Sequence, residues 1–156
     1  MGLIRVVRGA ASGPTRMASY DAALAEAGIH NYNLVSVSSV IPAGAHVERV
    51  GTAPDLGPAG ERLTVVEARA TVAEGTAVAG LAWTTEASGR GIFYEAAGSD
   101  AATVRARLEE GLAAGRALRD WAFVDEGREL VTADADAEGY TTAVALAVYG
   151  ESVPLL

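Results

Sequence analysis

The chain has 156 residues, half of them hydrophobic, and a formal charge of −8. This length suits one domain with a sizeable core, and the acidity argues against binding to nucleic acid or anionic membranes. All twelve cationic side chains are arginine and there is no cysteine, which argues against a pyridoxal phosphate enzyme, a Walker-type phosphate loop, disulfides and cysteine-bound metals. Without a leader pattern or an apolar run that could span a bilayer, we expect a cytoplasmic protein.

A strand followed by a helix is predicted at the start of the chain. Leu3–Arg8 has strand composition, and the glycines and proline of residues 9–14 are expected to end the strand. Pro14 or Thr15 opens the helix, and Gly28 stands where a left-handed cap would close it. The helical spacing predicts an apolar stripe of Met17, Tyr20, Leu24 and Ala27.

Asp21 lies on this stripe, four residues after Met17 and three before Leu24. An unpaired carboxylate on an inner helix face would be costly to bury. Asp21 therefore either reaches water at the edge of the stripe or awaits a cationic partner.

The stretch Asn31–Gly44 joins a buried-strand pattern to two adjacent serines. Its apolar run suits a strand covered on both sides, and the Pro-Ala-Gly of residues 42–44 ends it. Ser38 and Ser39 stand near its end, where each buried hydroxyl needs a partner. By residue type alone, a strand terminus with satisfied hydroxyls explains the pair as well.

Hairpins and a second helix are predicted in the rest of the chain. Residues 45–50 form a short strand and residues 51–60 a loop, and strands at 62–73 and 76–86 meet at Glu74-Gly75 as a hairpin. Residues 129–135 and 141–149 form a second hairpin. This order of elements predicts an α+β fold rather than a repeating βαβ series.

The strand at 92–97 and the helix at 100–119 lie between these hairpins. Alternation places Glu95 on one face with Phe93 and Ala97, which makes it a candidate acid with a raised pKa. The helix begins at Ser99 or Asp100. Its apolar stripe is predicted to consist of Val104, Leu108, Leu112 and Leu118.

Val37-Ser-Ser-Val-Ile-Pro42 resembles the self-cleavage site of the pyruvoyl-dependent arginine decarboxylases. Asn31-Tyr-Asn-Leu-Val35, Gly9-Ala-Ala-Ser-Gly-Pro-Thr15 and Gly91-Ile-Phe-Tyr-Glu-Ala96 are similar to segments of the same family, in the same order. The resemblance covers most of the chain. It implies a four-layer αββα sandwich of mostly antiparallel strands with two main helices, assembled as a homotrimer and open to further association.

The resemblance also implies a reaction. A single domain of residues 1–156 would be a zymogen that cuts itself between Ser38 and Ser39, giving chains 1–38 and 39–156. Ser39 would become a covalent pyruvoyl cofactor, with neither pyridoxal phosphate nor metal required. The enzyme would convert L-arginine to agmatine and CO2, a reaction that can feed polyamine biosynthesis.

By the same resemblance, Glu95 is the acid that protonates carbon, Asn33 a hydrogen-bonding group near the reacting centre, and Asp21 the partner of the substrate guanidinium. A carboxylate accepts two parallel hydrogen bonds from a guanidinium. Asn33 and Ser39, six residues apart, would be about 20 Å apart in an extended strand. Either the strand bends or the site is shared between subunits, and we favour the shared site.

Two other functions remain open from the sequence. A pyruvoyl enzyme acting on another amino acid, such as histidine, would share the cleavage and the electron sink. An uncleaved, non-catalytic oligomeric module would keep the fold, with Ser38 and Ser39 hydrogen-bonded in a turn.

Overall fold

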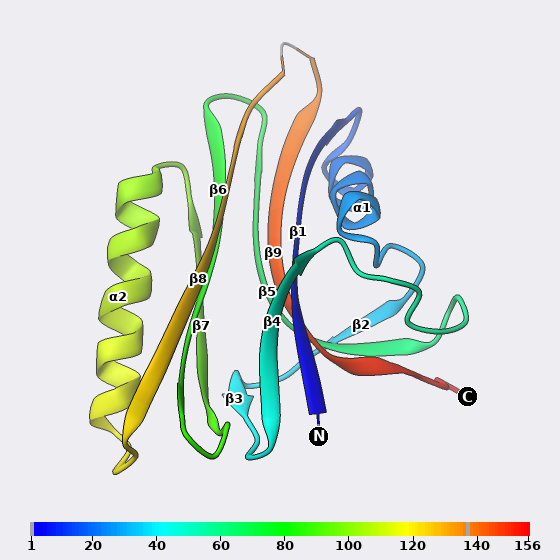
Figure 1. Cartoon of the computed structure of the whole chain (residues 1–156). Coiled ribbons are helices and arrows are strands. Elements are labelled where there is room, and N and C mark those ends of the chain that lie inside the picture. Colours follow the sequence, from blue (N-terminus) through cyan, green and yellow to red (C-terminus); the bar gives the residue numbers. More distant parts are fainter. Residues whose placement is uncertain (1, 137) are drawn as a thin grey trace.

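The computed structural model describes residues 2–136 and 138–156, which form two helices and nine strands in four layers (Figure 1). Helix α1 covers the outer face of one sheet, the two sheets pack face to face, and α2 covers the outer face of the other. The predicted α+β sandwich of mostly antiparallel strands is confirmed. The elements are β1 (Gly2–Gly13), α1 (Arg16–Ala27), β2 (Asn33–Ser36), β3 (Val40–Ile41), β4 (Ala45–Gly51), β5 (Arg62–Val72), β6 (Thr76–Glu86), β7 (Gly91–Gly98), α2 (Ala101–Ala117), β8 (Phe123–Asp134) and β9 (Tyr140–Val153).

The first sheet has the order β2-β5-β9-β1-β4, and the second has the order β3-β7-β6-β8. Among the strand pairs of residues 2–136 and 138–156, β1–β4 and β2–β5 are parallel and the others are antiparallel. The edge strands β2 and β3 are short, with four and two residues. Strands β5 and β7 therefore extend well beyond the partners that cover their outer edges.

Both predicted hairpins are wrong. Strands β5 and β9 lie in the first sheet and pair with each other, whereas β6 and β8 pair in the second. Each expected pair is instead divided between the layers. Residues 77–84 and 141–148 are buried throughout, because β6 and β9 are inner strands with a helix on one face and a sheet on the other. A turn such as the one at Gly75, where φ is +78°, serves a hairpin or a change of layer equally well.

Helix α1 begins as predicted, with the Thr15 side chain accepting a hydrogen bond from the Ala18 N–H at 3.0 Å, and it ends at Gly28 with φ of +82°. The preceding strand is longer than predicted and runs on through Gly9 to Gly13. A Cβ atom at Gly9 would collide with the Ala23 carbonyl of α1. These glycines therefore permit close packing of the helix rather than ending the strand.

The buried face of α1 differs from the predicted stripe. It consists of Ser19, Ala23, Leu24 and Ala27, while Met17 is 67% exposed. In α2, Asp100 is the N-cap and the predicted residues 104, 108 and 112 are buried, but Leu118 lies past the last turn and is 84% exposed. Neither helix, in the part of the chain that is described, is long and apolar enough to cross a membrane.

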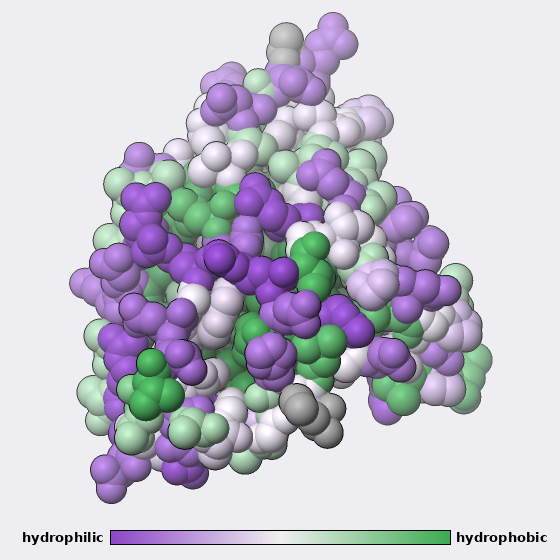
Figure 2. All heavy atoms as spheres, viewed as in Figure 1, coloured by the Kyte–Doolittle hydropathy of each residue, from purple (hydrophilic) through white to green (hydrophobic). Residues whose placement is uncertain are grey.

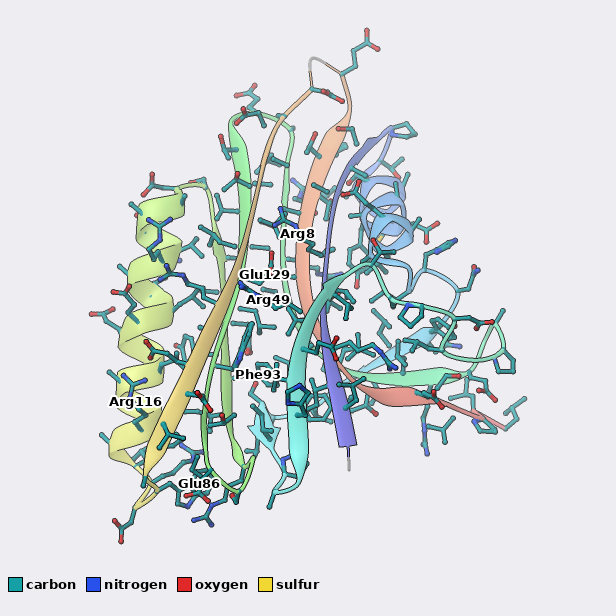
Figure 3. All side chains as sticks on the ribbon, viewed as in Figure 1. Arg8, Arg49, Glu86, Phe93, Arg116 and Glu129 are labelled. Atoms are coloured by element: carbon teal, nitrogen blue, oxygen red, sulfur yellow. The ribbon has the colours of Figure 1, made fainter. Side chains whose placement is uncertain are left out.

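Polar contacts join the two sheets on the side of β4 and β8. Arg8 pairs with Glu129 at 2.8 Å, and the Arg49 guanidinium donates to the Arg128 carbonyl at 2.7 Å (Figure 3). Polar side chains cover much of this face, with apolar side chains visible between them (Figure 2). In Figure 3, Phe93 points from β7 into the space between the sheets, where it belongs to the core.

The packing of β8 on the core can be tested by a substitution at Gly127. A Cβ atom there would overlap the indole of Trp83, whereas one at Gly2 would meet nothing within 4 Å. We expect Gly127→Ala to destabilise the fold by about 1–3 kcal/mol, as overpacking does, and Gly2→Ala to leave stability nearly unchanged. Urea unfolding of both variants measures the difference, and equal midpoints would contradict the packing described.

Candidate active site

Residues 37–39 carry the chain from one sheet to the other. The Val37 N–H donates to the Val65 carbonyl of the first sheet at 3.0 Å, and the Ser39 carbonyl accepts from the Phe93 N–H of the second at 2.8 Å. The single covered strand predicted over this stretch is therefore wrong. It is divided into β2 and β3, which lie at the edges of different sheets.

Ser39 has the left-handed backbone conformation, with φ of +70°, and among the described residues no other non-glycine residue has a positive φ. For a residue with a Cβ atom this conformation costs about 1–2 kcal/mol. Ser38 is exposed, and Ser39 is partly buried. The chain thus has its unusual backbone geometry at one residue of the predicted cleavage pair.

Glu95 and Ser39 lie in hydrogen-bond contact although they are 56 residues apart. The Ser39 hydroxyl donates to the Glu95 carboxylate at 3.1 Å. Because β3 pairs only with Gly91 and Ile92 of β7, β7 is left as the sheet edge at Glu95. The side chain is consequently exposed in this chain, rather than buried as its apolar neighbours in sequence suggested.

A cavity of about 350 Å³ lies beside this pair, between the edge of β7 and the C-terminal half of α2. Gly111 and Gly115 of α2 face it, and a Cβ atom at either would collide with Tyr94 or Ile92 of β7. The two glycines therefore let α2 approach the strand. The lining residues are Ser38, Ser39, Ile92, Phe93, Tyr94, Glu95, Gly111, Ala114, Gly115, Leu118 and Arg119.

Tyr149 approaches the same centre from the first sheet, and the sequence did not single it out. Its hydroxyl donates to the Val40 carbonyl at 3.0 Å. Burial, and secondarily the charge of Glu95, raise the pKa of Tyr149 well above its usual value. The phenol therefore keeps its proton near neutral pH and acts as a donor. Only the fold reveals this contact, because 109 residues separate the partners.

Asp21 and Asn33 line a different cavity, of about 530 Å³, between α1 and β2. Both side chains are exposed, so Asp21 faces this open cavity and not the core. The Asn33 amide donates to the Gly60 carbonyl at 2.8 Å, which holds its side chain against the loop before β5. The other lining residues are Met17, Ala18, Tyr20, Leu24, His30, Tyr32 and Leu34.

The predicted site residues thus form two groups in one chain: Ser38, Ser39 and Glu95 in one, Asp21 and Asn33 in the other. Within the described residues, the two cavities share no lining residue. Val35, Val37 and Val40, which lie in or beside the edge strands β2 and β3, are 44%, 42% and 47% exposed. Half-exposed apolar side chains on edge segments are of the kind that interfaces cover.

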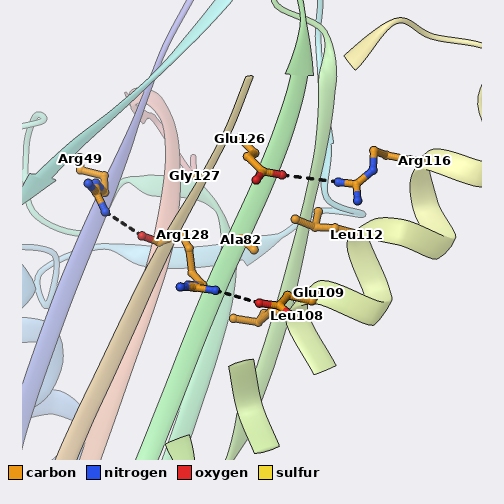
Figure 4. A pocket seen from close by; sticks show the side chains of 9 residues that line it. All are labelled: Arg49, Ala82, Leu108, Glu109, Leu112, Arg116, Glu126, Gly127 and Arg128. Carbon is orange, nitrogen blue, oxygen red and sulfur yellow. Dashed lines mark hydrogen bonds and ion pairs between the residues drawn. The ribbon is translucent and has the colours of Figure 1, made fainter. Parts of the chain in front are cut away.

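A further cavity of about 530 Å³ lies between β8 and α2, away from all these residues (Figure 4). Arg116 faces Glu126 at 3.8 Å there, and Arg128 faces Glu109 at 3.3 Å. These ion pairs are largely exposed, and such pairs contribute little to stability. Among the described residues that line it there is no hydroxyl nucleophile and none of the predicted site residues.

Comparison with known proteins gives a consistent result. Residues 3–154 match the family model described as pyruvoyl-dependent arginine decarboxylase. Proteins of that name from two strains of Halobacterium salinarum are each 51% identical over 157 residues, covering 99% of this chain and 98% of theirs. One from Methanothermobacter thermautotrophicus is 38% identical over 55 residues, about a third of either chain. The chain belongs to the pyruvoyl-dependent arginine decarboxylase family.

Proposed function

We propose that this protein cuts itself between Ser38 and Ser39 and then decarboxylates L-arginine to agmatine and CO2. The observation that carries the proposal is the contact of the Ser39 hydroxyl with Glu95, at a residue of left-handed backbone where the chain changes sheets. The names and full-length similarity of the Halobacterium salinarum relatives support arginine as the substrate.

The cleavage proceeds in three steps. The Ser39 Oγ bonds to the Ser38 carbonyl carbon, the Ser38–Ser39 C–N bond breaks, and the hydroxyl proton ends on the freed nitrogen. Loss of the Ser39 Cα proton then breaks the Cβ–Oγ bond and releases the Ser38 carboxylate. The unsaturated residue takes up water and loses ammonia, which leaves a pyruvoyl group on residue 39. Before these steps, the Ser39 hydroxyl donates a hydrogen bond to the Glu95 carboxylate at 3.1 Å.

The surroundings of Ser39 fit the group that would form there. Its side chain opens into the 350 Å³ cavity, and its carbonyl is held by the Phe93 N–H at 2.8 Å. A pyruvoyl group supplies a ketone that accepts the substrate amine and the electrons left by departing CO2. Glu95 then acts as the acid that delivers a proton to the substrate carbon.

Asp21 and Asn33 form the substrate-binding half of the site. Asp21 would receive the guanidinium by two parallel hydrogen bonds, and Asn33, fixed by the Gly60 carbonyl, would orient the substrate near the reacting carbon. Since one chain divides these residues from Ser39 and Glu95, we propose that the halves of one site come from neighbouring copies in a homotrimer. The exposed valines of residues 35–40 would be covered in that assembly. The cytoplasmic location stays a prediction.

Self-cleavage can be followed directly on the purified protein. We expect the 156-residue chain to give fragments of residues 1–38 and 39–156, the latter blocked by a pyruvoyl group, and Ser39→Ala to stay whole. Denaturing electrophoresis and intact-mass spectrometry measure both. Active protein whose Ser38–Ser39 bond is intact would refute the proposal.

The role of Glu95 can be separated from processing. Glu95→Gln keeps the size of the side chain but removes the acidic proton, so turnover per pyruvoyl group should fall about 100-fold or more, the range of general acid catalysis. Borohydride with labelled arginine should still label the 39–156 fragment. Near-normal turnover would remove Glu95 from the proton transfer.

Mixed oligomers test whether the site is shared. Asp21→Ala and Glu95→Gln should each be inactive at moderate arginine concentrations, but co-assembly restores both halves at about a quarter of randomly formed interfaces. We therefore expect activity in the mixture that neither variant has alone. Asp21→Ala mixed with Asn33→Ala is the matched control, because both changes damage the same half. A mixture no more active than its components would mean that each site lies within one copy.

A further inference from the structure

Tyr149 is partly buried and packs against the core beside the cleavage segment. Its ring meets that of Phe93 edge-on at 6.1 Å, and Phe93 meets Trp83 in the same manner at 6.0 Å. Such a row of aromatic rings restricts the rotamers of each member. The position of the Tyr149 hydroxyl is thereby set by packing across both sheets.

Two successive carbonyls after the predicted cut are held from opposite layers. The Phe93 N–H of β7 holds the Ser39 carbonyl at 2.8 Å, and the Tyr149 hydroxyl of β9 holds the Val40 carbonyl at 3.0 Å. The backbone on the C-terminal side of the Ser38–Ser39 bond is therefore anchored at consecutive residues. Its orientation relative to Glu95 depends on both anchors.

We propose that Tyr149 is a positioning residue for self-cleavage, which holds Val40 so that Ser39 keeps the left-handed conformation from which its hydroxyl attacks. This inference rests on the proposed self-cleavage. In the assisted step the Ser38 carbonyl carbon passes from the nitrogen to the Oγ of Ser39, and the hydroxyl proton moves to that nitrogen. Tyr149 exchanges no proton in this step. It contributes by limiting the conformations of the reacting residue.

The same contact is retained after cleavage, because Val40 and Tyr149 both belong to residues 39–156. Tyr149 consequently holds the residue that follows the pyruvoyl group, while Asp21 and Asn33 lie in the other cavity. Loss of the hydroxyl should therefore lower kcat per pyruvoyl group and leave KM for arginine nearly unchanged.

Tyr149→Phe tests the inference, because it keeps the ring against Phe93 and removes only the hydroxyl. Freshly synthesised precursor is incubated, and the loss of the full-length band is timed. We expect cleavage at least about fivefold slower than in the natural chain, the effect of one lost hydrogen bond on a rate. After complete processing, kcat per pyruvoyl group should fall by about the same factor, with KM within about twofold.

Tyr140→Phe is the matched control, since Tyr140 begins the same strand and its ring contacts Arg16. It should cleave at the natural rate. Thermal unfolding of both variants in the uncleavable Ser39→Ala chain detects any loss of folding, and similar midpoints with slow cleavage only in Tyr149→Phe support the inference. If Tyr149→Phe cleaves at the natural rate, the role of Tyr149 is refuted but the proposed self-cleavage is not. A natural chain that stays whole overturns self-cleavage as well.

Discussion

The organisation of the candidate site depends on one constraint: the backbone must leave the first sheet after Val37 and join the second at Ser39. Hydrogen bonds to Val65 and Phe93 hold the two ends of this crossing. Only Ser38 lies between them, so the change of layer is made over a very short stretch of chain. The left-handed conformation of Ser39 is the local result. Strained backbone conformations of this kind occur at functional sites, where the surrounding structure holds them in place.

The same crossing explains the incomplete edges of the sandwich. Because the chain crosses between the sheets here, the edge strands β2 and β3 are short. Glu95 and the valines of residues 35–40 are therefore left exposed. An isolated chain thus has its candidate site residues in two separate cavities and leaves three valines exposed. In the proposed trimer, a second copy that covers the valines would remove apolar surface from water and bring Asp21 and Asn33 to the Ser39 and Glu95 of its neighbour.

Much of the fold could be predicted from the sequence, because local chemistry determines it. Thr15, Gly28 and Asp100 begin or end their helices as expected, and the alternation around Phe93 identifies β7. The pairing of strands could not be predicted: the turn at Gly75 is compatible with a hairpin or a layer change, and burial of residues 77–84 on both faces becomes meaningful only once the helix α2 is known to cover them.

For the site, the resemblance of residues 37–42 to a cleavage motif led to Ser39, and the resemblance and alternation of residues 91–96 led to Glu95. The structure then revealed the contact between the two side chains. The sequence spacing of Asn33 and Ser39 also predicted that the two residues would lie far apart in an extended strand. Helical spacing left open whether Asp21 reaches water or awaits a partner on an inner face, because periodicity cannot tell a stripe facing the core from one facing an open cavity. The structure shows Asp21 exposed and lining a cavity. The sequence did not predict a role for Tyr149, because its hydroxyl contacts Val40, which is 109 residues away in sequence.

The place of β1 in its sheet has a consequence for the durability of the cut protein. A fragment of residues 1–38 would carry β1, α1 and β2, and β1 lies between β9 and β4, paired to both. After cleavage at Ser38, the fragment of residues 1–38 would therefore stay bound to the rest of the protein through β1. It would, however, turn refolding into an encounter between separate molecules, so recovery after denaturation would depend on protein concentration. A cleaved protein that unfolds would not readily refold, so slow unfolding would maintain its native state.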